Sequence, residues 1–143
     1  MLYIQEATMV KSASDGSILS PESRNECQSI MDAIYKEDPS YWPYGLDINA
    51  HDGGMYMVRQ ASTDAAIGFV GWQERNKGMK KVGYYTVGML PAYRGNGYAK
   101  AALSNLIQIK SAGVDQVLAF VVPHNKPSIA LADSIAVPVV HNV

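Results

Sequence analysis

Cysteine is nearly absent from this sequence, which has one, Cys27, in 143 residues. A single cysteine excludes an internal disulfide, and no CxxC pair or Cys/His cluster has the spacing of a zinc site. We therefore expect Cys27 to be a reduced thiol buried in a helix. The alternative is that Cys27 is a thiol nucleophile, because the catalytic partners of such a thiol must be close to it in space but not in the sequence.

Long apolar runs and a surplus of charge of one sign are also missing. The longest apolar stretch, around residues 117–123, is far too short to cross a bilayer, and the first residues have no basic segment before an apolar run. The formal net charge is −1, without a run of like charges, which argues against a protein that works by coating nucleic acid. We expect a cytoplasmic protein of the producing or host cell, with no membrane, metal or nucleic-acid partner.

The sequence does have enough apolar residues, 48%, for one core, and its 143 residues fit a single domain over residues 1–143. Ser20 and Pro21 indicate a helix start, and apolar residues at helical spacing extend that helix to about Lys36. Short polar turns between β-rich runs predict an antiparallel meander after an opening strand. The opening strand is expected at 2–7, the three runs at 55–58, 66–72 and 81–90, and the turns at 62–64 and 75–78.

The second half of the chain alternates strand and helix. After a glycine-bearing loop, a helix with one apolar face runs to Lys110, and a β-rich run at 114–122 follows it. That run is a candidate for a parallel or splayed neighbour of the preceding strand. A short helix at 126–134 and a last strand at 137–143, whose exposed edge could pair with a second copy, complete an α/β chain.

Residues 38–53 interrupt regular structure, because Pro39 and Pro43 disfavour helix there. Tyr41, Trp42 and Tyr44 give the segment an aromatic character. The segment is either a loop pinned to the core by its rings or one wall of a substrate pocket.

The most informative stretch lies between a strand end at Leu90 and the next helix, where Arg94, Gly95, Asn96 and Gly97 form a loop. The first N–H groups of a helix have no partners within it and lie at the positive end of its dipole, so they bind phosphate. Glycine permits positive φ and close approach of a phosphate, and arginine adds a charged fork. A tight turn that needs glycine is the alternative, but the arginine and the flanking elements favour phosphate. Neither the Walker A nor the GxGxxG pattern fits this loop.

The run from Arg94 to Ala99 resembles the pyrophosphate signature of the GCN5-related N-acetyltransferases (GNAT), Arg/Gln-x-x-Gly-x-Gly/Ala. Asn125 after the fifth strand and residues 128–131 in the short helix are also similar to the family pattern. The resemblance covers residues 54–143 well and residues 1–53 only in outline. The reduced length also resembles some members that bacteriophages encode.

This resemblance implies a single GNAT-like domain with a splayed, mostly antiparallel sheet of about six strands and flanking helices. The cofactor would be acetyl-CoA, whose pantetheine arm would enter the gap between the fourth and fifth strands beside the backbone of Val87 and Met89. Asn125 would complete the cofactor site. The acetyl group would pass directly to an amine of a small molecule or a protein in a ternary complex. The pyrophosphate would lie on Arg94, Gly95, Asn96, Gly97, Tyr98 and Ala99.

Two departures from the family pattern bear on catalysis. The tyrosine that commonly protonates the leaving thiolate is replaced by Ala132, and the fourth strand carries tyrosines and a threonine where a carboxylate base is expected. Tyr85 could contribute a hydroxyl, as could Tyr84, although packing is the simpler reading for both.

Three residues are predicted to act in catalysis, namely His124, Tyr85 and Asn125. His124 ranks first among the candidate bases because it adjoins Asn125 near the expected cleft, ahead of Glu74 and His51.

Two hypotheses follow. The first is an acetyl-CoA-dependent N-acetyltransferase, which the intact glycine loop favours. The second is a catalytically degenerate GNAT-like structural or interaction protein, for example a phage virion or assembly component, acting through a protein partner or as a homo-oligomer. The missing tyrosine and carboxylate favour the second.

Overall fold

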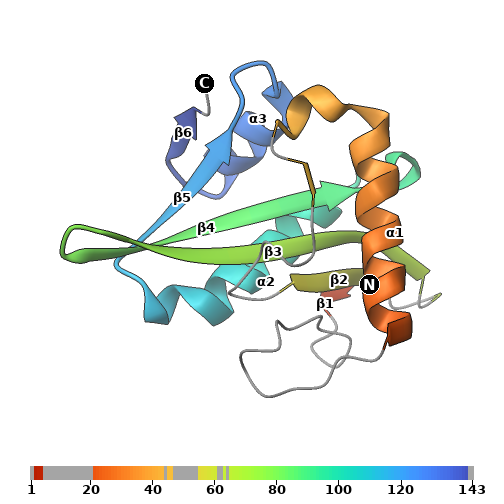
Figure 1. Ribbon diagram of the computed structural model, residues 1–143, viewed down its shortest axis with the longest axis horizontal. Helices are drawn as coiled ribbons and strands as arrows, with labels where there is room; N and C mark the ends of the chain where they lie inside the picture. Colours follow the sequence, from red (N-terminus) through yellow and green to blue (C-terminus); the bar gives the residue numbers. More distant parts are fainter. Residues whose placement is uncertain are drawn as a thin grey trace.

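The computed structural model describes residues 2–4, 21–43, 45–46, 55–60, 63 and 65–141. Within these ranges the strands form one six-stranded sheet in chain order (Figure 1). The first three pairings are antiparallel, whereas β4–β5 and β5–β6 are parallel. This is the mixed, mostly antiparallel sheet that was predicted. The strands are β1 (Leu2–Ile4), β2 (Met55–Gln60), β3 (Ala65–Lys77), β4 (Lys80–Met89), β5 (Gln116–Val121) and β6 (Val139–His141).

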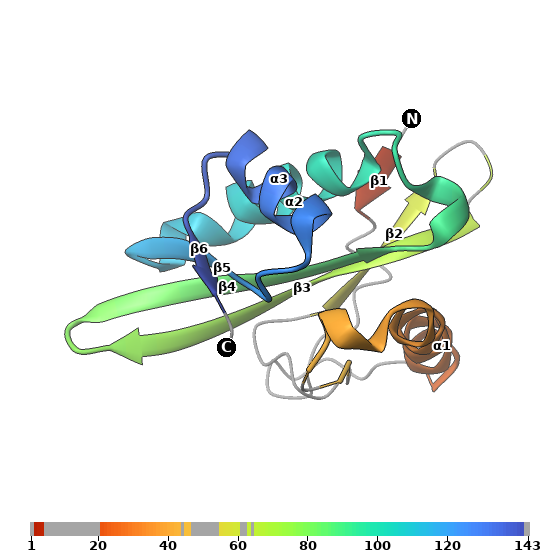
Figure 2. The same cartoon turned by 90° about the horizontal axis from the view of Figure 1, so that it is seen from above.

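Helices cover both faces of the sheet (Figure 2). The first, α1 (Pro21–Glu37), lies on one face, and α2 (Tyr98–Lys110) and α3 (Lys126–Ser134) lie on the other. Successive strand residues point to opposite faces, so Phe69 packs in the core under α1 and Val70 in the core under α2. Cys27 is fully buried in the α1 core, as expected. None of the described helices is long and apolar enough to span a membrane.

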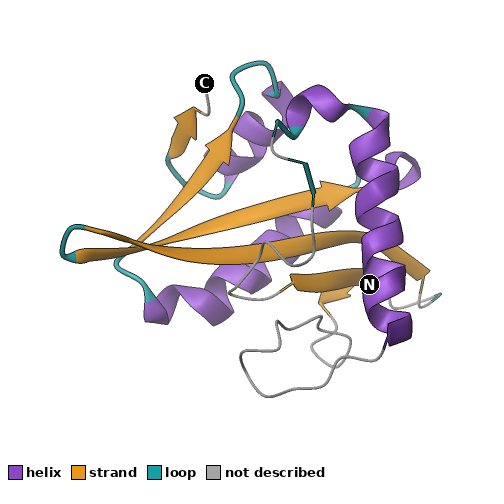
Figure 3. Cartoon of the chain, viewed as in Figure 1, coloured by secondary structure: helices purple, strands orange, loops and turns teal. Residues whose placement is uncertain are grey.

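The hairpin of β3 and β4 is longer than predicted. The segment 75–78, expected to be a turn, is mostly strand, because β3 continues to Lys77 and β4 begins at Lys80. Only Gly78 and Met79 form the turn, and the φ of 62° at Gly78 suits the first position of a two-residue hairpin loop. The two strands project beyond the rest of the sheet (Figure 3). The polar residues of this segment therefore alternate between the two faces of a strand.

The fourth and fifth strands separate as they run in parallel. Their pairing extends only from Val82 with Gln116 to Tyr85 with Ala119. Beyond that point β4 continues along β3 to Met89, while β5 follows β6. The resulting gap is visible in Figure 1. It is the splay that the family resemblance implies.

Element boundaries match the prediction best in the second half of the chain. The bounds of α3 are those predicted, and α2 ends at Lys110 as expected. The fifth strand is shorter than the predicted 114–122, and the sixth begins at Val139 rather than at 137. Ser20, the expected N-cap, and His51 lie outside the described residues.

Candidate active site

The loop after β4 has the backbone conformation that its glycines predict. It passes through a short 3-10 helix (Pro91–Tyr93), and Gly97 then caps α2. Gly95 and Gly97 have φ values of 80° and 77°, which disfavour residues with a side chain. A Cβ placed on either glycine would meet no atom within 4 Å. The glycines are thus required by the backbone, and the space above them is open to a ligand.

The open space belongs to a cavity of about 470 Å³, called here the loop cavity. The first turn of α2 opens onto it, and the N–H groups of such a turn have no partner within the helix. Arg94 and Lys100 add positive charge to its lining beside the glycine loop, and Glu37 and Asp38 add negative charge where α1 ends. The Nε of Arg94 donates to the carbonyl oxygen of Met89 at 3.0 Å, which ties this side chain to the end of β4. Asn96 does not line the cavity, and its Nδ2 donates to the Arg94 carbonyl at 3.3 Å.

The backbone of β4 faces the gap at Val87 and Met89. The Leu90 N–H donates to the carbonyl oxygen of Ile67 at 2.9 Å, so Leu90 and Ile67 form a hydrogen-bonded antiparallel pair. Because such pairs alternate, the N–H and C=O groups of Met89 and Val87 point away from β3, toward the side of β5. The pairing with β5 has already ended at Tyr85. An extended ligand in the gap can therefore pair with β4 like an added strand.

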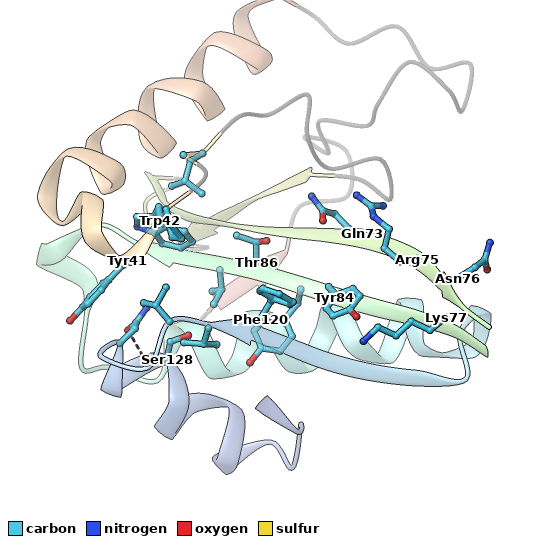
Figure 4. Close-up of a pocket in the computed structure, with 18 residues that line it drawn as sticks. Tyr41, Trp42, Gln73, Arg75, Asn76, Lys77, Tyr84, Thr86, Phe120 and Ser128 are labelled. Carbon is cyan, nitrogen blue, oxygen red and sulfur yellow. Dashed lines mark hydrogen bonds between the residues drawn. The ribbon is translucent and has the colours of Figure 1, made fainter. Parts of the chain in front are cut away.

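A second cavity, of about 520 Å³, is called here the hairpin cavity. Figure 4 shows Tyr41 and Trp42 at one end of it, Tyr84 and Thr86 in the middle, and Lys77 at the other end. The described part of the 38–53 segment thus forms a wall of a cavity. The ring of Trp42 also lies 6.2 Å from that of Phe69, so the wall is pinned to the core as well.

The two cavities meet at residues that line both, and we call this place the junction. It lies where β4 and β5 have separated, since Val87 follows the last β4–β5 pair. A ligand in the gap and a ligand over the hairpin would therefore touch each other there. The junction residues are Tyr41, Trp42, Val87, Asn125 and Ser128.

Asn125 has a structural role at the junction. It is 9% exposed, and its Oδ1 accepts from the Ser128 N–H at 3.3 Å, which caps the N-terminus of α3. Its Nδ2 makes no hydrogen bond with any described residue. The amide is therefore fixed by its oxygen and presents a donor to the site.

Tyr85 is buried and lines the hairpin cavity. Burial raises the pKa of its hydroxyl from 10.0 to about 12. The hydroxyl has no hydrogen-bond partner in the described part of the chain. At neutral pH this phenol keeps its proton and cannot serve as a base, and its oxygen is buried with the core under α2 rather than exposed to a ligand.

His124 lies outside the lining of both cavities and bridges two segments of the chain. Its Nε2 is 3.0 Å from Ser40 Oγ, which is 2.6 Å from Asp38 Oδ1. A carboxylate can only accept, so the Ser40 hydroxyl donates to Asp38 and accepts from a protonated Nε2. The His124 ring also lies 5.3 Å from the ring of Tyr41. The geometry thus makes His124 a support for the Tyr41 end of the wall.

The other residues considered for catalysis lie away from the junction or carry no suitable group. Ala132 is fully buried in the core under α2 and α3. Glu74 lines neither cavity, accepts from Trp72 Nε1 at 2.9 Å and lies 3.2 Å from Lys81 Nζ. The Trp72 hydrogen bond and the Lys81 charge lower the pKa of its carboxyl. In the described ranges, no group of three or more His, Cys, Asp or Glu side chains could hold a metal ion.

Sequence reasoning did not single out two hydroxyl-bearing residues that line the junction. Tyr41 was noted only as an aromatic residue, and Ser128 only as part of the resemblance. The proline-interrupted aromatic segment was the available signal for Tyr41. Ser128 carried none beyond its place in the first turn of α3.

Comparisons with known proteins give the family and the fold. A profile of the acetyltransferase (GNAT) family matches residues 21–135. AAC(6')-Iy in complex with the bisubstrate analogue CoA-S-monomethyl-acetylneamine has a TM-score of 0.67 at 14% identity, over 100% of this chain and 95% of that one. Arabidopsis thaliana NAA60 in complex with acetyl-CoA has a TM-score of 0.61 at 16% identity, over 95% and 84%. A Trypanosoma brucei acetyltransferase has a TM-score of 0.57 at 15% identity, over 100% and 94%. A search of curated proteins finds no match.

Proposed function

We propose that this chain, which belongs to the GNAT acetyltransferase family, is an N-acetyltransferase that takes acetyl-CoA in the loop cavity and an amine in the hairpin cavity. The observation that carries the proposal is the junction, where the two cavities share residues at the end of the β4–β5 gap. A purely structural module has no need of two cavities that meet at this point.

The residues of the loop cavity fit acetyl-CoA. The loop and the first turn of α2 offer unpaired N–H groups, open space and the cations of Arg94 and Lys100 to a pyrophosphate. The backbone of Val87 offers a strand edge to the pantetheine arm. Two neighbours in fold, at low identity, hold acetyl-CoA or a CoA-based analogue, which is consistent with this assignment.

Bound acetyl-CoA would supply an acetyl thioester at the junction. The amine nitrogen forms a bond to the carbonyl carbon as the carbon–sulfur bond breaks, the nitrogen loses one proton, and the sulfur gains one. Holding both reactants in one site supplies much of the rate, because a bimolecular encounter becomes an intramolecular one. No covalent intermediate with the protein is needed.

The proton for the sulfur must come from a group other than residue 132, which is a buried alanine. Tyr41 and Ser128 are the two hydroxyl-bearing residues that line both cavities, and a phenol is the better proton donor of the two. We assign this role to Tyr41. Asn125 donates a hydrogen bond to the bound ligands through Nδ2, and His124 positions Tyr41 through ring packing.

The second candidate function is a module of the same family that binds but does not catalyse. The observation that favours it is the lack of the family tyrosine at Ala132 together with a fourth strand that carries no carboxylate. Under this alternative acetyl-CoA could still bind, but no amine would be acetylated.

Turnover assays with acetyl-CoA and a panel of amines separate the two candidates. The panel would contain amino acids, peptide amines and polyamines, with CoA release and the mass of the acetylated product as readouts. The enzyme proposal predicts an acetylated amine and initial-rate lines that intersect, as expected for a ternary complex. Saturable acetyl-CoA binding without acceleration by any amine would support the module instead.

A further inference from the structure

On the premise of the proposed function, we infer that the acceptor is a primary amine that carries an aromatic ring one or two carbons from its nitrogen. Phe120 of β5 and Tyr84 of β4 would bind the ring in the middle of the hairpin cavity, while the amine reaches the junction. Phe120 would then determine the specificity for the acceptor.

Phe120 is an apolar side chain that stays half exposed inside a cavity. It is 49% exposed and lines the hairpin cavity, whereas Leu118 and Val122, two residues before and after it, are each 7% exposed. Isolated exposed apolar side chains are common on protein surfaces. Three of those in the described part of this chain line neither cavity, namely Tyr35, Met79 and Ile109. Phe120 differs from them because it lines a space that a ligand can fill.

Tyr84 provides one aromatic contact to Phe120 and leaves room for another. The two ring centroids lie 5.9 Å apart with an interplanar angle of 69°, which is an edge-to-face arrangement. Figure 4 shows the two rings side by side in the middle of the cavity. Aromatic rings favour tilted or offset contacts at centroid distances of about 4.5–7 Å. A third ring can pack in this way on the exposed part of Phe120 and remove water from both surfaces.

The separation of the strands places Phe120 beside the junction. The last β4–β5 pair joins Tyr85 to Ala119, so Phe120 is the first residue of β5 beyond it. Val87 of the junction is two residues beyond Tyr85 on β4. The two positions therefore differ by one residue, or about 3.3 Å along the strand direction. A ring on Phe120 and a nitrogen at the junction should thus be only a few ångströms apart, which one or two carbons can span.

The two ends of the hairpin cavity differ in chemistry. Trp42 adds aromatic surface at the junction, whereas the charged side chains of Arg75 and Lys77 lie nearer the turn of the hairpin (Figure 4). An acceptor of the proposed length contacts the rings and does not extend to the charged side chains. A small polar amine also reaches the junction, but it leaves Phe120 in contact with water.

Three primary amines test the inference, namely 2-phenylethylamine, propylamine and 4-phenylbutylamine. Propylamine lacks the ring, and 4-phenylbutylamine carries it two carbons further from the nitrogen. We expect kcat/KM for 2-phenylethylamine to exceed that for propylamine by roughly 10- to 100-fold, because the ring is removed from water and packs on Phe120. It should exceed that for 4-phenylbutylamine by roughly three- to tenfold, because the longer linker carries the ring past Phe120.

Three variants connect the preference to Phe120. Phe120→Ala should lower kcat/KM for 2-phenylethylamine roughly tenfold and leave that for propylamine nearly unchanged. Phe120→Tyr keeps the ring and should keep the preference. Ile109→Ala removes a side chain of similar exposure, 47%, that lines neither cavity, and it should also keep the preference.

The other outcomes would overturn different statements. Equal use of 2-phenylethylamine and propylamine, or a preference that survives Phe120→Ala, would overturn the acceptor class and leave the proposed function in place. An equal loss for both amines in Phe120→Ala would overturn it too, because the side chain would then support the site as a whole. Acetyl-CoA binding without acetylation of 2-phenylethylamine would also overturn it, while leaving the cofactor site intact. Failure of the wild-type protein to bind acetyl-CoA would instead defeat the proposed function itself.

Discussion

The two cavities of this protein are built in different ways. The loop cavity takes one whole wall from a single short stretch, in which the end of β4, the glycine loop and the start of α2 follow one another directly, while α1, the Tyr41 segment and α3 complete its lining. The hairpin cavity is assembled from segments far apart in the chain, including the wall at Tyr41, the hairpin, β5 and α3. The glycine-loop wall of the first cavity is therefore specified by local sequence, whereas the hairpin cavity depends on tertiary packing throughout. The junction depends on both, because it consists of the residues that line the two cavities together.

The largest effect is expected for Tyr41→Phe, which would test whether the wall takes part in catalysis. Loss of the proposed proton donor should lower kcat by about 100-fold with little change in acetyl-CoA affinity. Ser128→Ala removes the other hydroxyl of the junction and should have a much smaller effect on kcat. Steady-state kinetics measures kcat, and calorimetry measures the affinity for acetyl-CoA. Equal rates for Tyr41→Phe and wild type would remove Tyr41 from the mechanism.

The next largest effect is expected when a tyrosine, which the family pattern has at this position, replaces Ala132. Ala132→Tyr places a phenol ring at a fully buried position, so it should lower the free energy of unfolding by about 1–3 kcal/mol. Ala130→Tyr on an exposed position of the same helix is the matched control and should be nearly neutral. Denaturant unfolding measures both. A stable Ala132→Tyr variant with raised activity would show that the junction accepts the family arrangement.

Tyr85 is a buried residue of the hairpin cavity, and the pH dependence of protein stability tests its burial. Its pKa is raised from 10.0 to about 12, so between these pH values the unfolded chain loses the phenol proton while the folded chain keeps it. The free energy of unfolding should therefore decrease as pH rises through this window, by up to about 2 kcal/mol from this group. Tyr85→Phe lacks this contribution, so its stability should fall less than that of the wild type between pH 10 and 12. Parallel pH profiles for the two proteins would contradict this account.

The smallest effect is expected for the contact between Ser40 and His124, which supports the Tyr41 end of the wall. Ser40→Ala removes the hydroxyl between His124 and Asp38 at an exposed site, which should change the free energy of unfolding by less than about 1 kcal/mol. If the contact holds Tyr41 in place, KM for the amine should rise while the acetyl-CoA affinity stays the same. An unchanged KM would mean that Tyr41 is held by the rest of its packing.

These differences explain how much of the molecule the sequence could predict. The Arg94–Ala99 loop and the bounds of α3 were predicted correctly because turn chemistry, capping and helical spacing are local. The length of the β3–β4 hairpin was not predicted correctly. Residues 75–78 have the polar composition of a turn, but β3 extends to Lys77 because it pairs with β4. Arg75 and Lys77 were therefore not predicted to line the hairpin cavity.

Side-chain partners were also beyond the sequence. Nothing local indicates that His124 would meet Ser40, 84 residues earlier, or that it would lie outside both cavities. The same holds for Asn125, whose role as the cap of α3 depends on where that helix begins. Local patterns located these residues near the site, but only the fold gives them their contacts.

Calorimetric titration with acetyl-CoA of the wild type, Gly97→Asp and Gly78→Asp tests the central claim most directly. Both glycines have positive φ and open space around them, so the two variants carry the same added charge and similar backbone strain at different places. We predict saturable one-site binding by the wild type and by Gly78→Asp, and a loss of about 100-fold or more in Gly97→Asp, where like charges would meet. Absence of binding by the folded wild type at millimolar acetyl-CoA, or equal binding by Gly97→Asp, would contradict the account.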